Sequence, residues 1–479
     1  MLFDRDDVLR MLHGFNPWWS RRTLALPPFR RAVYGACRRH LESQSAQSVL
    51  LLSGLRGTGK TTILLQLATD LVASGADPKS VLYLGMGHPV FGRLPLTEIL
   101  DLYREMIHAR DLPAILLLDE MHYAREWDHH VKELLLGEQE YRIIATESVQ
   151  MIERALVTET QFGRWTALSA PSLSFFEYLA LRGLDPQAPG TDFDPGGRAP
   201  VTAATIEQAA AGLRPVMTHF RSYLAGGGLP WLASNSDSAG NRAVMHEDAA
   251  ESILRRDIAL HFGARNVEDL KRLFVFVCMH SGDVFPVQRY ARLVGASAST
   301  VASHVELLER CFLVRKLQPV GAGGAVVQKA RHRVFVTDTT LRNAQLLRDA
   351  DHLTDPEELR RLVATCMVRH IVERYAKALA RIGYWRDARS RRDVDVVVQD
   401  VAGSVVYQNM YDRPATLSEK DSVVQYCRAE NIPRAYLVTR DENDIAVFKL
   451  PGLDTEFVKI PAHVMAYLLG RAECKSATG

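Results

Sequence analysis

The sequence predicts a multidomain α/β protein whose first large domain contains a parallel β-sheet. Short apolar runs alternate with helical stretches over residues 46–170, as expected when crossover helices join parallel strands. A glycine-rich turn, Gly54–Thr61, follows the first run, and the acidic pair Asp119-Glu120 follows the third. The 479 residues, 47% of them hydrophobic, suffice for about two to four domains with cores of their own.

The glycine-rich turn matches the P-loop pattern G-x-x-x-x-G-K-[ST], between the strand-like run Val49–Leu52 and the helical stretch Thr62–Leu71. Its glycines let successive backbone N–H groups face an anion, and the helix N-terminus adds its dipole. We expect Lys60 to contact the β- and γ-phosphates and the Thr61 hydroxyl to ligate Mg²⁺. The predicted ATP-binding residues are Gly54, Leu55, Arg56, Gly57, Thr58, Gly59, Lys60, Thr61 and Thr62.

The acidic pair lies where a parallel sheet binds its ligand. Ala114–Leu118 is apolar throughout, which is typical of a strand buried on both faces, and a residue after such a strand lies at the carboxyl edge of the sheet. We expect Asp119 to hold Mg²⁺ and Glu120 to orient the attacking water. A solvated loop acid is the alternative for Glu120. The two elements together predict ATP hydrolysis with Mg²⁺.

Composition narrows the class of protein. A net charge of +2 does not by itself favour nucleic acid, although arginines cluster at 21–22, 30–31, 38–39 and 386–392; a solvated face is the alternative for each cluster. Six scattered cysteines without C-x-x-C spacing argue against zinc and disulfides. The start is acidic and no apolar stretch has membrane-spanning length, so we expect a cytoplasmic protein without a membrane partner.

Pro/Gly-rich and polar segments divide the chain into five predicted parts. The parts are a helical and aromatic segment (1–45), the P-loop core (46–170), a helical lid and linker (171–265), a winged-helix domain (266–345) and a last α/β domain (346–479). The fourth part rests on helix-turn-helix form, with Val287–Leu293 and Ser299–Arg310 as the helices. Its second helix would present Ser299, Thr300, Ser303 and His304 to phosphates or bases; a structural spacer is the alternative.

Across nearly its whole length the chain resembles the prokaryotic AAA+-type P-loop ATPases that carry a winged helix and a C-terminal restriction-endonuclease-like domain of unknown function. The resemblance rests on the P-loop and, in order, on Asn16-Pro-Trp-Trp19, Leu118-Asp-Glu-Met-His122, Gly163-Arg-Trp165, Leu173-Ser-Phe-Phe-Glu-Tyr-Leu179, Gly227-Gly-Leu-Pro230, Val334-Phe-Val-Thr-Asp338 and Val394-Asp395. It implies a homo-oligomer, a ring or hexamer, with ATP sites between subunits.

The resemblance implies roles for further residues. Thr146 would be the polar sensor of the γ-phosphate or the attacking water; relatives usually have Gly beside it, but here Glu147 follows, so Ser148 is a rival. Arg164 would be an arginine finger for a neighbouring subunit, with an intradomain ion pair as the alternative. Trp18-Trp19 would pack near the adenine or form a core aromatic cluster.

The nuclease-like part departs from its family's pattern, which requires an Asp and then Glu-x-Lys on the next strand. Asp395 fits the first position, with Asp393 and Glu373 nearby, but Gln408 and Met410 replace the Glu and the Lys. A neutral amide is a poor Mg²⁺ ligand, and Met carries no charge. We therefore expect a degenerate domain that binds or assembles without cutting DNA.

Three functions follow in order of preference. The first is an oligomeric ATPase that couples ATP turnover to DNA binding or remodelling, including branched or junction DNA. The second is a regulatory ATPase switch that acts on protein partners. The third, disfavoured by Gln408 and Met410, is a defence or toxin-type nuclease.

Overall fold

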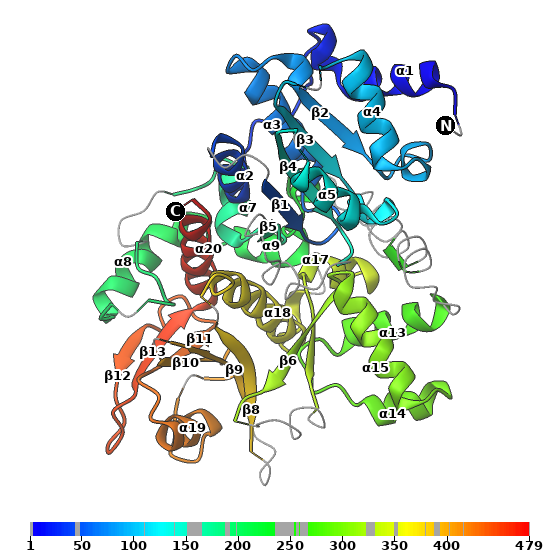
Figure 1. Ribbon diagram of the computed structural model, residues 1–479. Coiled ribbons are helices and arrows are strands. Elements are labelled where there is room, and N and C mark those ends of the chain that lie inside the picture. The colour runs from blue at the N-terminus through cyan, green and yellow to red at the C-terminus, as the bar shows by residue number, and fades with distance from the viewer. Residues whose placement is uncertain are drawn as a thin grey trace. The chain divides into compact units, whose positions relative to one another are not determined.

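The computed structural model describes residues 3–43, 48–109, 111–137, 139–150, 165–186, 192–197, 199–234, 253–254, 258, 267–321, 331–348, 353–378, 380–387, 393–401, 403–414 and 416–478. The chain forms two compact units (Figure 1). The first comprises Met1–Pro171 with Arg310–Phe312, and the second comprises Ser172–Glu309 with Leu313–Ala477. Within the described residues the first unit holds a parallel five-stranded sheet and the second a mixed eight-stranded one.

The five strands of the first unit lie in the order β2-β3-β4-β1-β5, and all neighbours pair in parallel. They are β1 (Ser48–Ser53), β2 (Val81–Gly85), β3 (Ala114–Asp119), β4 (Tyr141–Glu147) and β5 (Trp165–Ser169). β1 is buried along its whole length, and β3 and β4 are nearly so, which suits strands covered on both faces. Because β4 lies between β3 and β1, the carboxyl ends of these three strands meet.

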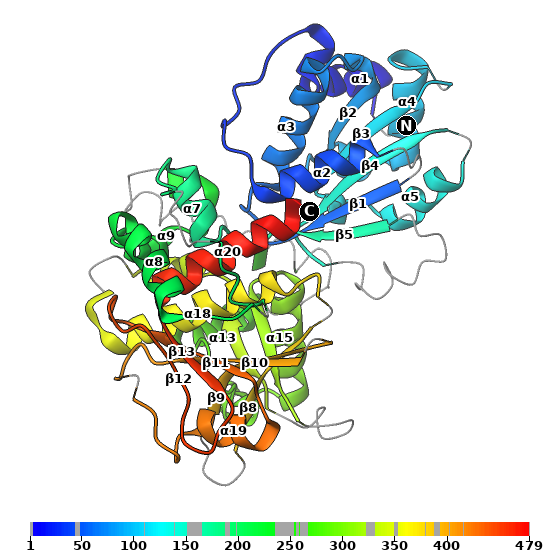
Figure 2. The same ribbon diagram turned by 90° about the vertical axis from the view of Figure 1, so that its left-hand side faces the viewer.

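Helices cover both faces of this sheet. They are α1 (Arg5–Phe15), α2 (Ala32–Glu42), α3 (Lys60–Ala73), α4 (Leu96–Met106) and α5 (Trp127–Leu136), with short 3₁₀ helices η1 (Pro17–Ser20), η2 (Pro78–Ser80), η3 (Phe91–Arg93) and η4 (Met121–Tyr123). Figure 2 shows α2 and α3 on one face and α4 and α5 on the other. α1 packs against β2 and α4.

The aromatic segment before α2 covers the edge strand β2. The Asn16 side chain donates to Tyr83 O at 3.0 Å and accepts from Tyr83 N at 2.7 Å, as a neighbouring strand would. The indoles of Trp18 and Trp19 both donate to Val81 O at 3.0 Å. The tryptophans therefore belong to a core cluster that protects a sheet edge, three strands away from β1.

The second unit begins with short helices and ends with long ones. Its helices are α7 (Phe175–Leu181), α8 (Ala203–Leu213), η5 (Arg214–Val216), α9 (His219–Gly226), α10 (Pro230–Ser234), α13 (Val267–Met279), α14 (Val287–Val294), α15 (Ala298–Arg310), α17 (Thr339–Gln345), α18 (Pro356–Arg374), α19 (Ser422–Glu430) and α20 (Ala462–Thr478). Ser174 begins α7 with a capping box, in which it exchanges hydrogen bonds with Glu177. Gly295, at φ 69°, ends α14 in the left-handed conformation and so makes the tight turn to α15.

The eight strands of the second unit lie in the order β12-β13-β11-β10-β9-β8-β6-β7. They are β6 (Val314–Pro319), β7 (Arg333–Val336), β8 (Arg381–Arg386), β9 (Asp393–Asp400), β10 (Gly403–Asn409), β11 (Arg434–Thr439), β12 (Ala446–Phe448) and β13 (Glu456–Pro461). β6 pairs with β7 and also with β8, through Gln318 and Pro319. β6 and β7, which lie in the predicted winged-helix part, therefore share one sheet with the strands of the last α/β part. Figure 2 shows α18 and α20 on one face of it and α19 on the other.

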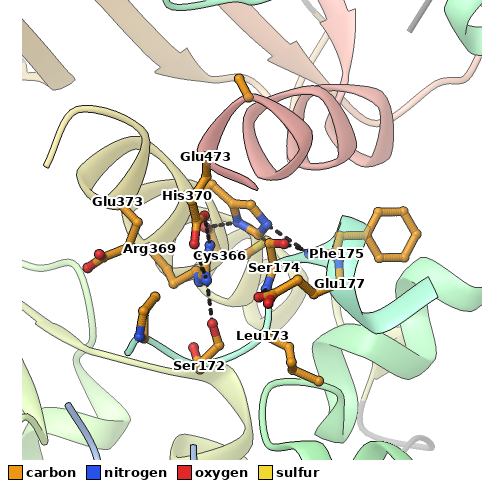
Figure 3. Close-up of polar contacts among 12 residues, drawn as sticks. Ser172, Leu173, Ser174, Phe175, Glu177, Cys366, Arg369, His370, Glu373 and Glu473 are labelled. Atoms are coloured by element: carbon orange, nitrogen blue, oxygen red, sulfur yellow. Dashed lines mark hydrogen bonds and ion pairs between the residues drawn. The ribbon is translucent and has the colours of Figure 1, made fainter. Parts of the chain in front are cut away.

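A buried polar cluster joins α18, α20 and the start of α7 (Figure 3). Arg369 donates to both carboxylate oxygens of Glu473 and to the carbonyl of Ser172. His370 Nε2 accepts the backbone N–H of Phe175 at 3.0 Å, while Nδ1 lies 2.8 Å from Cys366 O. Nδ1 is therefore the protonated nitrogen and the ring is neutral.

All six cysteines are buried free thiols. Among the described residues, no helix combines the length and the apolar character needed to cross a membrane.

Candidate functional site

The P-loop connects β1 to α3 as the sequence predicts. Gly57 and Gly59 have φ of 84° and 91°, a left-handed conformation that side chains rarely adopt. A Cβ on Gly54 would lie 2.3 Å from Ala170 O, at the end of β5, so this position tolerates only glycine. Gly59 is the N-cap of α3, and the loop's N–H groups and the positive end of the helix dipole belong to the same turn. This backbone fits a phosphate chain.

Lys60 is turned back onto the loop that carries it. Its Nζ donates to Gly54 O at 2.7 Å and to Leu55 O at 2.8 Å, and the residue is 5% exposed. Burial lowers the pKa of Lys60 to about 8, against the attraction of Asp119 and Glu120. Two carbonyl oxygens compensate an ammonium charge poorly. The amine is thus held ready for a stronger anion, such as a phosphate.

Asp119 is the centre of the hydrogen-bond network at the sheet edge. Its Oδ2 accepts from Thr61 Oγ1 at 2.7 Å and from Tyr83 OH at 2.9 Å, and its Oδ1 accepts from Thr146 Oγ1. The side chain is 3% exposed. These three partners are hydroxyls, which donate hydrogen bonds without bringing a positive charge to the carboxylate. Carboxylate and hydroxyl oxygens are ligands that Mg²⁺ accepts, so Asp119 and Thr61 fit the predicted metal role.

The end of β4 brings Thr146 to this network. Besides donating to Asp119, Thr146 Oγ1 accepts the backbone N–H of Glu120 at 2.9 Å. Glu147 is buried and accepts from Ser53 Oγ at 2.8 Å, on the neighbouring strand β1. The rival Ser148 is also buried, and its N–H lies 3.4 Å from His122 Nδ1. Of the two sensor candidates, Thr146 is the one that contacts Asp119.

Glu120 has a strained backbone. Its φ of 53° and ψ of 47° are left-handed, which is uncommon for a residue with a side chain and recurs at functional sites. Its carboxylate lies close to Gly87, where an added Cβ would be 2.2 Å from Oε2, and Oε1 lies 3.9 Å from Arg56 Nη1. The turn therefore directs the Glu120 carboxylate toward the P-loop, beside Arg56.

Sequence reasoning missed two residues that build the site. Arg31 Nη1 donates to Thr58 O at 2.9 Å and to Pro171 O at 2.7 Å, and so fixes the loop from outside. Tyr83 reaches Asp119 from the edge of the sheet, and burial together with Asp119 raises the pKa of its hydroxyl, which keeps it a donor. The sequence signals available for these residues were weak. Arg31 belongs to a pair of arginines, and Tyr83 is a polar-tipped side chain within an apolar strand.

The other predicted residues lie as follows. Thr58 is buried and its hydroxyl donates to Leu55 O at 2.9 Å, which closes the P-loop turn, while Thr62 lies in α3. Arg164 lies outside the described residues. In the second unit Gln408 and Asn409 hydrogen-bond Asp395, as detailed below.

Two residues of the nuclease-like pattern lie elsewhere. Met410 is buried in the hydrophobic cluster with Val406 and Val424. Glu373 Oε1 lies 3.4 Å from Arg315 Nη2 on β6. Neither side chain takes part in the hydrogen bonds of Asp395.

Family models match two parts of the chain. Residues 46–179 match the model described as AAA domain, and residues 217–352 match the model described as Domain of unknown function (DUF8612). The first match contains all five strands of the parallel sheet, so the described nucleotide-site candidates lie in the part of the chain that matches the AAA domain model.

Curated relatives align with more of the chain but at low identity. A protein of Methanocaldococcus jannaschii, described as uncharacterized, is 25% identical over 307 residues, which are 60% of this chain and 61% of that protein. Another from Haemophilus influenzae, likewise described, is 20% identical over 308 residues, 63% of this chain and 70% of that protein. The chain thus spans less than two thirds of the archaeal relative's length.

Solved structures resemble the chain only distantly. The Thermotoga maritima RuvB Holliday junction branch migration motor is 14% identical, with 73% of this chain and 96% of that chain covered at a TM-score of 0.26. The replication initiator DnaA bound to AMPPCP and single-stranded DNA is 15% identical, with 62% and 92% covered at a TM-score of 0.25. C. elegans PCH-2 is 17% identical, with 48% and 63% covered at 0.27.

Proposed function

We propose that this protein is an ATP-hydrolysing, Mg²⁺-dependent AAA ATPase. One observation carries the proposal: the Asp119 carboxylate holds the hydroxyls of both Thr61 and Thr146 at the end of a P-loop with a buried, poorly compensated Lys60. Thr61 and Asp119 would hold Mg²⁺, which neutralises phosphate charge when bound. Lys60 would leave the carbonyls of Gly54 and Leu55 for the phosphates.

The remaining residues would act on the water that attacks the γ-phosphate. Glu120 would accept its proton or orient it, since the carboxylate already points toward the P-loop. Thr146 would fix the position of Glu120 through the bond to its backbone N–H.

The direct test is ATP binding and turnover by Lys60→Ala. We expect loss of tight nucleotide binding, because the loop loses its fixed cation, whereas Lys79→Ala, at an exposed lysine of the same unit, should bind and hydrolyse ATP like the wild type. Equal ATP affinity in Lys60→Ala and wild type would refute the proposal.

We further propose a homo-oligomer, a ring or hexamer, in which Arg164 acts on the ATP of a neighbouring subunit. Mixing Arg164→Ala with Lys60→Ala subunits should then restore part of the activity, since some interfaces carry one intact half from each variant. Verified mixed oligomers without recovery would assign Arg164 to an intradomain role. A protein that stays monomeric with ATP analogues would exclude the ring.

We propose DNA as the partner of this protein because of the helices and exposed arginines of the second unit. We interpret α13, α14, α15 and the β6–β7 pair as a winged helix, and the α18-β8-β9-β10-α19-β11 order as a degenerate nuclease-like fold. Arg289 and Arg292 of α14 are exposed, and Ser297 caps α15 by accepting Thr300 N at 3.0 Å. DNA affinity should fall with rising salt, and Arg289→Ala/Arg292→Ala should weaken it for all sequences.

A protein partner is the second candidate because α15 carries no lysine, and its single arginine, Arg310, is its last residue. Undetectable binding of duplex, single-stranded and four-way DNA at low salt would favour this alternative. Nuclease function is the third candidate, and metal-dependent DNA cleavage that disappears in Asp395→Ala would support it.

A further inference from the structure

Arg333, at the start of β7, reaches two carboxylates of β9. Its Nη1 donates to Asp395 Oδ1 at 2.9 Å, and its Nη2 donates to Asp393 Oδ2 at 2.8 Å. The guanidinium also lies over the ring of Tyr384 on β8, 5.1 Å from its centroid. Arg333 is 8% exposed and both carboxylates are partly exposed, so this forked contact is partly buried.

The second oxygen of Asp395 is occupied as well. Its Oδ2 accepts from Gln408 Nε2 at 2.7 Å and from the backbone N–H of Asn409 at 2.9 Å, both on β10. Both carboxylate oxygens of Asp395 therefore already accept hydrogen bonds.

Among the described residues, two acceptors in the cluster have no hydrogen-bond donor, Gln408 Oε1 and Asp393 Oδ1. Gln408 is 5% exposed, and its Oε1 has no hydrogen-bond partner among the residues that the structure describes. Gln408, Arg333 and Asp395 are among the residues that line a cavity of about 60 Å³. Carboxylate and amide oxygens are the ligands that a hard divalent cation takes, and here the Arg333 guanidinium lies between the two carboxylates.

The charges balance without a metal ion. Burial opposes the charge on Arg333, but Asp395 and Asp393 outweigh it and hold the pKa of the guanidinium above its usual range. Arg386 Nε lies 3.4 Å from the remaining oxygen of Asp393. Two arginines thus face two carboxylates, and Arg333 stays charged at every physiological pH.

We propose that the Arg333 guanidinium is the built-in cation of this site: it takes the place that a divalent metal would otherwise hold between Asp393 and Asp395, next to Gln408. The site is therefore metal-independent, and every Mg²⁺ effect on this protein originates elsewhere in the chain. The same bonds tie β7, and with it the β6–β7 pair, to β9. This inference rests on the second unit alone and does not require ATP hydrolysis.

The test is Mn²⁺ binding to the nucleotide-free full-length protein, followed by electron paramagnetic resonance and by the Mn²⁺ dependence of Tm. Arg333→Met/Gln408→Glu removes the cation at similar volume and supplies a third carboxylate. We expect it to gain a Mn²⁺ site and a Tm that rises with Mn²⁺, because a ligand stabilises the state that binds it. Adding Asp395→Asn should abolish both gains. A folded double variant without a gained site would overturn the proposal.

A second arm keeps Arg333 and so does not depend on how the double variant folds. In the wild type and in Gln408→Glu, Mn²⁺ binding should be the same with and without an added Asp395→Asn substitution. The reason is that the guanidinium still occupies the carboxylates. Asp395-dependent Mn²⁺ binding in either protein would refute the proposal. Equal Mn²⁺ binding with and without Asp395→Asn would support the proposal even if Arg333→Met/Gln408→Glu did not fold.

Discussion

Asp119, at the end of β3, and Asp395, near the start of β9, each accept several hydrogen bonds, but their donors differ in charge. The donors to Asp119 are the hydroxyls of Thr61, Tyr83 and Thr146, whereas Asp395 accepts from the guanidinium of Arg333. Hydroxyls order a carboxylate and leave its charge available to a cation. A guanidinium orders it and neutralises it. The same residue type therefore accepts uncharged donors in one unit, where we propose that it holds Mg²⁺, and is paired with a cation in the other.

The largest expected effect concerns the residue next to Asp119. Glu120→Gln should still bind ATP but turn it over more slowly, by roughly two to four decades, because an amide cannot accept the water's proton. Glu126→Gln is the matched control, since Glu126 is also left-handed but is exposed. Steady-state turnover and ATP affinity decide the matter. Wild-type turnover in Glu120→Gln would remove Glu120 from the catalytic residues and leave the Asp119 site with binding alone.

Replacing each aspartate by asparagine compares the two sites directly. Asp119→Asn should lower Mg²⁺-dependent turnover by roughly two decades, because the metal loses a charged ligand. Asp395→Asn should leave turnover within about twofold but cost about 1–3 kcal/mol of stability, since Arg333 loses a charged partner in a partly buried pair. Turnover at varied Mg²⁺ and urea unfolding measure the two effects. If Asp395→Asn changed how ATP turnover depends on Mg²⁺, the proposed difference between the Asp119 and Asp395 sites would be wrong.

How much of each site was predictable follows from the strand order. The P-loop and Glu120 follow apolar strands, and Asp119 and Thr146 lie at the carboxyl ends of such strands. Parallel pairing gathers these positions at one edge, so the local pattern sufficed to group them. Arg31 and Tyr83 were not predicted because their hydrogen bonds depend on tertiary packing. Arg31 is placed by the packing of the N-terminal segment, and Tyr83 by the packing of the edge strand β2.

The second unit was less predictable for the same physical reason. Arg333 precedes Asp393 by some sixty residues, and only the addition of β6 and β7 to the last sheet brings them together. Gln408 is beside Asp395, as its position on the next strand suggests, whereas Met410 follows the strand's end and turns into the apolar cluster. Residue spacing predicts neighbours along one sheet but not a cation supplied by a distant strand.

A smaller effect separates the two sensor candidates beside Asp119. Thr146→Val keeps the shape and removes the hydroxyl that joins Asp119 to the Glu120 backbone, so kcat should fall by roughly 10- to 100-fold with a smaller change in KM. Ser148→Ala should change kcat by less than about threefold. The reverse order of effects would make Ser148 the sensor and would show that contact with Asp119 does not identify the catalytic hydroxyl.

The smallest effect tests whether buried ionisable groups of the second unit are structural, as Arg333 suggests. His370 is neutral and accepts the Phe175 N–H, and burial, followed by the charge of Arg369, holds the pKa of His370 well below its usual range (Figure 3). Below about pH 6.5 the unfolded chain therefore binds a proton at His370, whereas the folded chain does not. The contribution of His370 to stability should be complete above about pH 6.5 and fall by about 1.4 kcal/mol per pH unit below it.

The measurement compares two proteins because Glu473 also affects the pH dependence of stability. Burial raises the pKa of Glu473 to about 7, so its contribution to stability changes with pH in the opposite direction. His370→Gln can still accept the Phe175 N–H and cannot titrate, so its urea midpoint should fall less steeply than that of the wild type between pH 6.5 and 5. Parallel curves would mean that His370 is protonated in the folded protein and that its bond to Phe175 is not what keeps it neutral.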